Sequence, residues 1–216
     1  MKLYSYFRSS AAYRVRIALN LKGIAYETIP VHLIKDGGRH RQAEYRAVNP
    51  HMRVPALVAP NGKVLFQSLA IIEYLEEIAP SPPLLPKDPI ARAQVRGLAD
   101  IVACDIHPIN NLRVLRYLMR ELGHDEAAIA KWYNHWIAAG FQALEPLLAQ
   151  DARTGAFCHG DSPGLADIAL VPQVVNAERY QLDRGPYPTL MRVYENCMKL
   201  GPFIAAHPSK QPDYEP

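Results

Sequence analysis

Two serine hydroxyls, Ser9 and Ser10, open the segment SSAAYRVRIAL, directly after the short apolar run KLYSYF. The apolar residues Ala11, Val15, Ala18 and Leu19 are spaced to share one face of a helix, and Gly23 is placed to end it. A helix that starts here directs its unpaired N–H groups and the positive end of its dipole toward Ser9. The segment therefore favours a bound anion next to Ser9, with the alternative that Ser9 or Ser10 serves only as the N-cap.

The elements that must position these serines follow from the hydrophobic pattern. Residues 1–80 alternate short strand-like and helical runs in the order βαβαββα, and Asn61 and Gly62 between two apolar runs indicate a hairpin. The proline-rich residues 81–89 predict a linker, and residues 90–216 are almost entirely helical in pattern. We expect an α/β domain followed by an all-α domain, with the last residues, HPSKQPDYEP, forming a loose tail.

The order βαβαββα is that of a thioredoxin-like domain, in which the loop after the first strand leads into the first helix at the functional end. A thiol oxidoreductase carries cysteines in this loop, whereas this chain has Ser9, Ser10, Ala11 and Ala12. Because disulfide exchange needs a nucleophilic sulfur, these residues cannot perform it. The possibility that a serine of this loop acts on the sulfur of another molecule remains open.

Composition excludes several classes of function. The chain has 216 residues, 49% of them hydrophobic, which is enough for a substantial core in one or two domains. Its net charge of +3, without clusters of Lys and Arg among aromatic residues, argues against nucleic-acid binding. The N-terminus lacks a signal-peptide pattern and no apolar run is long enough to span a bilayer, so we expect a complete cytoplasmic protein without a membrane partner.

The three cysteines, Cys104, Cys158 and Cys197, are widely separated and form no CxxC or CxxH pair. An odd number of isolated cysteines predicts neither a disulfide framework nor a zinc site. We therefore expect buried free thiols in a reducing compartment, and no metal.

Five segments resemble the zeta class of the glutathione transferases, which includes the maleylacetoacetate isomerases and the similar bacterial maleylpyruvate isomerases. They are SSAAYRVRIAL from Ser9, VPAL from Val54, QSLAIIEYLEE from Gln67, CDIHPINNLRVL from Cys104 and NAERY from Asn176. The similarity extends over essentially the whole chain. It departs at Ala11, where the family pattern has Cys, so no role of that cysteine carries over.

The resemblance implies a thioredoxin-like domain, residues 1–80, that binds glutathione, and an all-helical domain, residues 90–216, that binds substrate. It implies a homodimer that converts maleylacetoacetate to fumarylacetoacetate in aromatic amino acid catabolism, with glutathione as cofactor. The thiolate adds to the cis double bond, the bond rotates, and elimination leaves the trans isomer. Three alternatives stay open: a maleylpyruvate isomerase of gentisate catabolism, a transferase or dehalogenase acting on small α-halo acids, and a non-catalytic glutathione-binding protein.

By this resemblance the Ser9 hydroxyl stabilises the thiolate of glutathione, with Ser10 as the nearest competitor for that role. A thiol with a pKa of roughly 8.5 is only slightly ionised at neutral pH, so a donor next to the sulfur is needed. Gln67 and Ser68, at the start of the helix SLAIIEYL, are implied to bind the γ-glutamyl carboxylate, with a plain N-cap as the alternative.

Further glutathione contacts are implied in two other segments. Val54 precedes Pro55 in a bond that is cis in resembling proteins and exposes the backbone to the cysteinyl part of glutathione. His40 or Lys35 is expected to meet the glycyl carboxylate, with the alternative that such polar residues are simply solvated.

The segment around Pro108 carries two more candidates. His107 and Asn111, with Asn110 as an alternative to Asn111, match positions of the isomerases' site, which implies that they bind glutathione. Pro108 should kink a helix here and turn these side chains toward the site. The alternative is a kinked core helix in which the histidine has a structural partner.

A substrate with two carboxylates needs cations that grip both. Arg8, directly before Ser9, and Arg179, in NAERY, are the first candidates, and Arg113, in NNLRVL, is a third. The alternative for each of these arginines is a solvated or ion-paired side chain without a role in binding substrate. For Arg14 and Arg16, within the first helix, we expect structural roles.

Overall fold

The last residues of the chain pack with its first residues. In a computed structural model, which describes residues 1–215, the first of two units contains Met1–Pro83 together with the residues from Lys199 onward. The second unit is Leu84–Met198. The boundary after Pro83 falls within the expected linker, residues 81–89. The expected helical domain, residues 90–216, is therefore too long at its C-terminal end.

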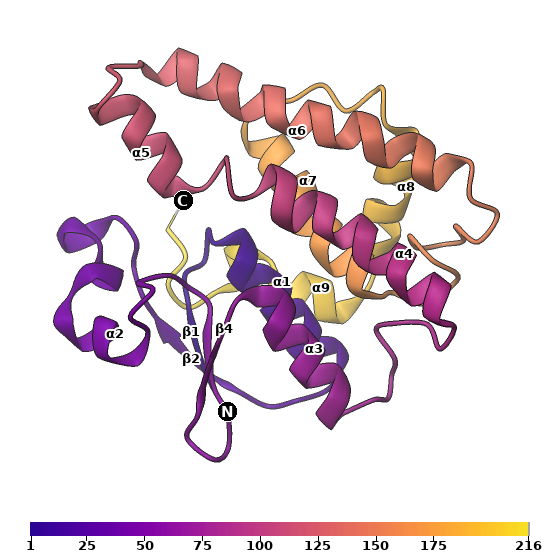
Figure 1. Cartoon of the computed structure of the whole chain (residues 1–216), viewed down its shortest axis with the longest axis horizontal. Coiled ribbons are helices and arrows are strands. Elements are labelled where there is room, and N and C mark those ends of the chain that lie inside the picture. The colour runs from indigo at the N-terminus through magenta and orange to yellow at the C-terminus, as the bar shows by residue number, and fades with distance from the viewer. Residues whose placement is uncertain (216) are drawn as a thin grey trace. The chain divides into compact units, whose positions relative to one another are not determined.

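Four strands form one mixed sheet in the first unit (Figure 1). They are β1 Lys2–Ser5, β2 Glu27–Pro30, β3 Ala56–Val58 and β4 Val64–Phe66. The order in the sheet is β2-β1-β3-β4, with β1 and β2 parallel and the other two pairs antiparallel. Gly62 has φ +79 in the turn between β3 and β4, a conformation that glycine adopts without steric cost. The strand order confirms the thioredoxin-like fold.

Helices cover both sides of this sheet. α1 Ser10–Leu21 and α3 Ser68–Ile78 pack together on one side, and α2 Ala43–Val48 lies on the other, after short 3-10 turns at Lys35–Gly37 and Arg39–Arg41 (Figure 1). α1 is buried on all sides from Ala12 to Leu19, α3 buries one face, and both contribute buried apolar side chains to the core. These include Val15, Ile17, Leu19, Ile71, Ile72 and Leu75. A smaller hydrophobic cluster contains Tyr6, Phe7, Val31, Tyr45 and Val54.

The C-terminal residues are anchored on α1. α9 Gly201–Ala206 packs against α1, where the Asn20 side chain donates to the Pro202 carbonyl over 3.0 Å, and a 3-10 turn, Pro208–Lys210, follows. Farther along, Asp213 accepts a hydrogen bond of 3.0 Å from the backbone N–H of Phe7. The prediction of a loose tail is therefore wrong, because this polar segment has its partners at the other end of the chain.

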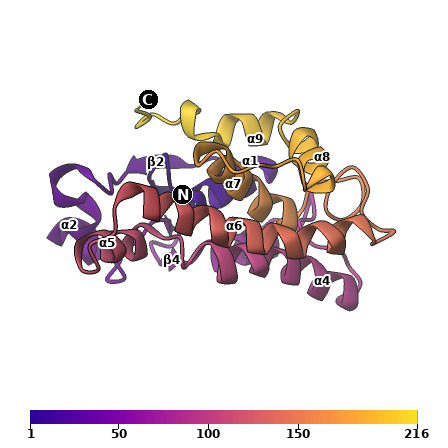
Figure 2. The same ribbon diagram turned by 90° about the horizontal axis from the view of Figure 1, so that it is seen from above.

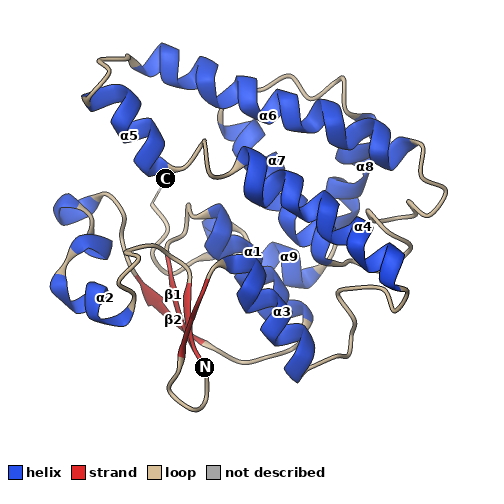
Figure 3. Ribbon diagram, in the orientation of Figure 1, coloured by secondary structure: helices blue, strands red, loops and turns tan. Residues whose placement is uncertain are grey.

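The second unit is helical throughout its regular structure (Figure 2). Its elements are α4 Pro89–Asp100, a π-helical turn Ile101–Ile106, α5 Leu112–Arg120, α6 Glu126–Ala149, α7 Leu165–Arg179 and α8 Pro188–Cys197. α7 is buried along most of its length and packs against α4, α6 and α8. Figure 3 shows the strands of the described chain gathered in the first unit alone, which confirms the expected division into α/β and all-α parts.

The segment around Pro108 departs from the kinked helix that we expected. α4 runs into the π-helical turn, whose last bond joins the His107 N–H to the Val102 carbonyl over 2.9 Å. Pro108 has no N–H with which to continue the pattern. The chain instead turns and starts a separate helix, α5, with Asn111 as its N-cap.

Three features expected from composition can be compared with the fold. Among residues 1–215, none of the helices combines the length and apolar character that a membrane span needs. Over the same residues, His, Cys, Asp and Glu side chains do not gather in threes as metal ligands. Cys158 and Cys197 are buried, but Cys104 is exposed, so the prediction is wrong for Cys104. It lies on the solvent side of the π-helical turn, away from the buried Val102.

Candidate active site

Ser9 ends a tight turn and caps α1. Its N–H donates to the Tyr6 carbonyl over 2.9 Å, and its hydroxyl oxygen accepts from the Ala12 N–H over 3.2 Å. Ser9 is therefore the N-cap of α1, but the cap uses only a lone pair of the hydroxyl. Because a serine hydroxyl accepts and donates at once, its hydrogen is still able to bind an anion.

The two serines differ in accessibility. Ser9 is half-buried, whereas Ser10, the first residue of α1, is buried with 8% of its surface exposed. A sulfur atom of a bound molecule reaches an accessible hydroxyl more readily than a buried one. This difference favours Ser9 over Ser10 as the thiolate ligand.

Arg8 carries an exposed positive charge beside Ser9. Its guanidinium carbon lies 5.0 Å from the centroid of the Phe7 ring, within the range of a cation–π contact. The ring orients the side chain while the charged group stays accessible. Arg8 is thus available to an anionic ligand next to Ser9.

A second helix start, at Ser68, has an unusual backbone. Gln67, the residue before α3, has φ 69 and ψ 120, and its side chain does not cap the helix. A non-glycine residue at positive φ costs about 1–3 kcal/mol and is typical of functional sites. The first N–H groups of α3 therefore lack a side-chain cap, which leaves them suited to bind a carboxylate.

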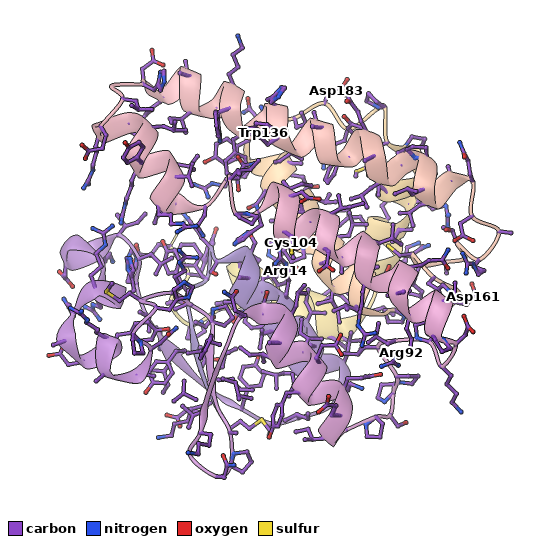
Figure 4. All side chains as sticks on the ribbon, in the orientation of Figure 1. Arg14, Arg92, Cys104, Trp136, Asp161 and Asp183 are labelled. Carbon is purple, nitrogen blue, oxygen red and sulfur yellow. The ribbon has the colours of Figure 1, made fainter. Side chains whose placement is uncertain are left out.

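Arg14 reaches this helix start from α1. Its Nη1 donates to the Ser68 hydroxyl oxygen over 3.3 Å, and both side chains are buried. Figure 4 labels Arg14 on the first unit, where its side chain leaves the α1 ribbon. The pair places a buried positive charge behind the expected carboxylate pocket and links the two helices that start at Ser10 and Ser68.

The Val54-Pro55 bond is cis, the isomer that the resemblance implies. The residues before it are held by two side chains, because Tyr45 Oη and Asn49 Nδ2 both donate to the Arg53 carbonyl, over 2.6 and 2.8 Å. Burial raises the pKa of Tyr45, so its hydroxyl stays protonated as a donor. This loop leads directly into β3 and is well supported where the cysteinyl part of a bound peptide is expected.

The two candidates for the glycyl carboxylate have different surroundings. Lys35 forms an ion pair with Glu215, so its charge is already partnered. The His40 ring packs against Gly38, which has φ +99, and an added Cβ there would lie 2.5 Å from His40 Cε1. The ion pair with Glu215 counts against Lys35 as a ligand of the glycyl carboxylate.

The candidates around Pro108 have structural partners within the second unit. The Asn111 side chain accepts from the Arg113 N–H over 3.2 Å at the start of α5. The neighbouring Asn110 is buried and donates to the Tyr133 carbonyl over 3.1 Å. Arg113 itself is exposed, and His107 is half-buried at the end of the π-helical turn.

Arg179, the last residue of α7, lies near an aromatic stack that the sequence analysis missed. Its guanidinium carbon is 5.4 Å from the centroid of the Tyr180 ring, and Tyr180 stacks on Tyr133 with ring centroids 3.8 Å apart. Burial raises the pKa of Tyr133. The sequence signal was the aromatic run KWYNHW, which by itself is also typical of a core helix.

Models of two domain families match the chain. Residues 8–78 match the glutathione S-transferase N-terminal domain, and residues 130–197 match the glutathione S-transferase C-terminal domain. The N-terminal match includes Ser9, Val54 and Ser68, and the C-terminal match includes Arg179.

Individual relatives match over nearly the full length. The maleylacetoacetate isomerase of Pseudomonas aeruginosa is 50% identical over 213 residues, which cover 99% of this chain and 98% of that protein. The holo structure of a bacterial maleylpyruvate isomerase of the zeta class has a TM-score of 0.96 and 52% identity, with 100% of both chains covered. A maleylacetoacetate isomerase from Methylobacterium extorquens AM1 with bound malonate and glutathione has a TM-score of 0.95 and 42% identity, again with 100% of both chains covered.

Proposed function

The chain belongs to the zeta class of the glutathione transferases, in the family of the maleylacetoacetate and maleylpyruvate isomerases, and we propose that it is a glutathione-dependent cis–trans isomerase acting on maleylacetoacetate. The observation that carries the proposal is the accessible Ser9 hydroxyl at the start of α1, whose hydrogen is not needed for capping. Arg8 beside it adds a positive charge.

Residues of the first unit suit glutathione as the cofactor. The uncapped start of α3, with Ser68 backed by Arg14, suits the γ-glutamyl carboxylate. The loop at Val54 suits the cysteinyl backbone, and His40 suits the glycyl carboxylate. A relative of 42% identity binds glutathione together with a dicarboxylate, malonate, which supports the same pairing of ligands here.

Glutathione, when bound, supplies a thiolate that adds to the cis double bond and leaves again once the bond has rotated. Ser9 donates its hydrogen bond to that sulfur and so favours the ionised form, with help from the positive end of α1. Arg8 and Arg179 hold the two carboxylates of the substrate, with Arg113 as a third cation. Cations beside the ketone also stabilise the negative charge that develops on its oxygen.

Maleylpyruvate is the second candidate substrate. It has the same cis double bond conjugated to a ketone, and a maleylpyruvate isomerase at 52% identity is as similar to this chain as the maleylacetoacetate isomerases are. The pocket chemistry that we propose, a thiolate donor and two or three arginines, serves both substrates equally.

The test is to assay both substrates with and without glutathione and to follow glutathione itself. We expect isomerisation only in the presence of glutathione, which is recovered unchanged. Consumption of glutathione with α-halo acids would instead indicate a transferase or dehalogenase. Binding of glutathione without turnover of either substrate would indicate a binding protein, and this result would contradict the proposal.

We also propose that the protein is a homodimer and acts in the cytoplasm. Several large apolar side chains are exposed, including Phe66 with 56% and Ile90 with 70% of their surface accessible. Such exposure is common where a second copy covers the surface. Sedimentation velocity at several concentrations tests the dimer, and a monomer at all of them would exclude it.

A further inference from the structure

The turn of residues 6–9, which presents Arg8 and Ser9, is closed by one internal hydrogen bond. That bond, from the Ser9 N–H to the Tyr6 carbonyl, leaves the N–H and the carbonyl of Phe7 directed away from the turn. Tyr6 and Phe7 are buried, with 3% and 2% of their surfaces exposed. Because a buried backbone group without a partner costs about 1–3 kcal/mol, the conformation of this turn depends on outside partners.

Arg16 supplies the partners for the carbonyls. This fully buried side chain of α1 donates from Nη1 to the Tyr6 carbonyl over 3.4 Å and from Nη2 to the Phe7 carbonyl over 3.3 Å. Its Nη1 also bonds Ser5 Oγ over 2.9 Å, and its Nε bonds the Ala206 carbonyl over 3.0 Å. One guanidinium therefore joins the turn to β1 and to the C-terminal helix α9.

Asp213 supplies the partner for the remaining N–H. Its Oδ2 accepts from the Phe7 N–H over 3.0 Å, across a separation of 206 residues. Burial lowers the pKa of Arg16 to about 10, and Tyr26, Tyr13 and the Asp213 carboxylate oppose that lowering, in that order. Asp213 therefore serves both the backbone of the turn and the cation that holds its other side.

The two residues after Asp213 hold the segment in place. The Tyr214 ring packs edge-on against the Phe7 ring with centroids 5.6 Å apart, on the same ring that contacts the Arg8 guanidinium. Glu215 forms ion pairs with Lys35 and with His32, the latter over 3.6 Å. The C-terminal segment, residues 213–215, thus contacts the turn through a hydrogen bond, a ring contact and a charged anchor.

We propose that the C-terminal segment is a positioning element of the active site, in which Asp213 holds the turn so that the Arg8 guanidinium and the Ser9 hydroxyl face the thiol of glutathione. The inference rests on the proposed role of Ser9. Asp213 itself does not touch the reacting atoms. It is a positioning residue that acts through Phe7, and the chain end supports the turn that carries Arg8 and Ser9.

The test compares Asp213→Ala, Asp213→Asn and a control, Glu77→Ala, which removes an exposed carboxylate of α3. The main readout is the pH titration of bound glutathione, followed by the ultraviolet absorbance of its thiolate without substrate. For Asp213→Ala we expect the pKa of bound glutathione to rise by about one unit, so that the ratio of thiolate to thiol at neutral pH falls about tenfold and kcat/KM falls as well. In Asp213→Asn the amide oxygen still accepts from Phe7, so its kcat/KM should stay within about threefold of the wild-type value. The control Glu77→Ala should have the kcat/KM of the wild type.

Wild-type titration and kcat/KM in folded Asp213→Ala would overturn the inference. If Asp213→Ala does not fold, nuclear magnetic resonance of the Phe7 amide in the wild-type protein is the deciding measurement. Slow exchange with solvent and a shift on addition of glutathione support positioning, whereas fast exchange contradicts it. A wild type that ionises glutathione but isomerises neither substrate would refute the proposed function and leave the role of Asp213 intact, so the two failures are distinguishable.

Discussion

Arg14 and Ser68 are joined by a buried hydrogen bond of 3.3 Å between residues 54 positions apart. The bond connects the middle of α1 to the first residue of α3. Because the Ser68 oxygen accepts this bond from Arg14, the hydrogen of the Ser68 hydroxyl is directed toward a different partner. The guanidinium also adds positive charge to the start of α3, where the dipole already favours an anion.

Replacement of Arg14 by Met keeps the length of the side chain but removes the donor and the charge. We expect the KM for glutathione to rise about tenfold, with a smaller change in kcat, because the loss concerns binding rather than the reacting atoms. Arg46→Met, at an exposed arginine of α2, is the control. Steady-state kinetics with varied glutathione give the result, and an unchanged KM in folded Arg14→Met would show that the charge does not serve this pocket.

Ser9 is the N-cap of α1, and two substitutions separate this role from the catalytic role that we propose for it. Ser9→Ala should lower kcat/KM by about 10²-fold through loss of a donor to the thiolate, and should destabilise the fold by about 1 kcal/mol through loss of the cap. Ser9→Gly should recover most of the stability, since glycine is a tolerable N-cap, but none of the activity. Kinetics and thermal unfolding of both variants are the measurements. A larger loss of activity in Ser10→Ala than in Ser9→Ala would reassign the thiolate ligand.

Replacement of Arg179 should weaken the binding of the substrate and leave the binding of glutathione unchanged. In Arg179→Gln we expect the KM for the dicarboxylate to rise about tenfold while the KM for glutathione stays unchanged, because one charge-assisted carboxylate contact is lost. Arg184→Gln, which removes a nearby half-buried arginine paired with Glu178, is the matched control. Equal effects of the two substitutions would indicate a general change of charge instead of a carboxylate contact.

Two glycines of the second unit should respond in opposite ways to alanine. A Cβ at Gly140 in α6 would lie 2.2 Å from Ile106 Cδ1, so Gly140→Ala should destabilise the protein by about 1–3 kcal/mol through overpacking. A Cβ at Gly97 in α4 would meet no atom within 4 Å, so Gly97→Ala should be neutral or stabilising by up to about 1 kcal/mol. Chemical unfolding measures both, and equal stabilities would contradict the close packing of Ile106 on α6.

The anchor at Glu215 should depend on pH. Lys35 lowers the pKa of Glu215 below its ordinary value of 4.5, with a further contribution from His32. A lowered carboxyl pKa means that the anchor is complete above the ordinary value and is lost as the pH falls through the lowered one. Hydrogen exchange of residues 207–215 should therefore accelerate in acid. Glu215→Gln serves as the reference, and identical pH profiles of the two proteins would refute the contribution of Glu215.

The local features of this protein were predictable from neighbouring residues. The helix start at Ser9, the turn at Gly62 and the order of strands and helices along the chain depend on spacing and on turn chemistry over a few positions, so the pattern alone indicated the thioredoxin-like unit and the helical one. The family followed from motifs of the same short range. The assignment of site residues such as Val54, His107 and Arg179 stays a prediction, because it concerns ligand contacts.

What only the tertiary structure decided is which distant groups meet. Local pattern could not pair Arg14 with Ser68, or Phe7 with Asp213, since such bonds depend on how packed helices and the chain end come together. For the same reason the sequence interpretation left Cys104 buried and the last residues loose. A polar segment looks like a solvated tail until the fold presents a buried N–H and a cation that need its carboxylates. The sequence by itself determined the helix that carries Ser9, and the fold decided what holds Ser9 in place.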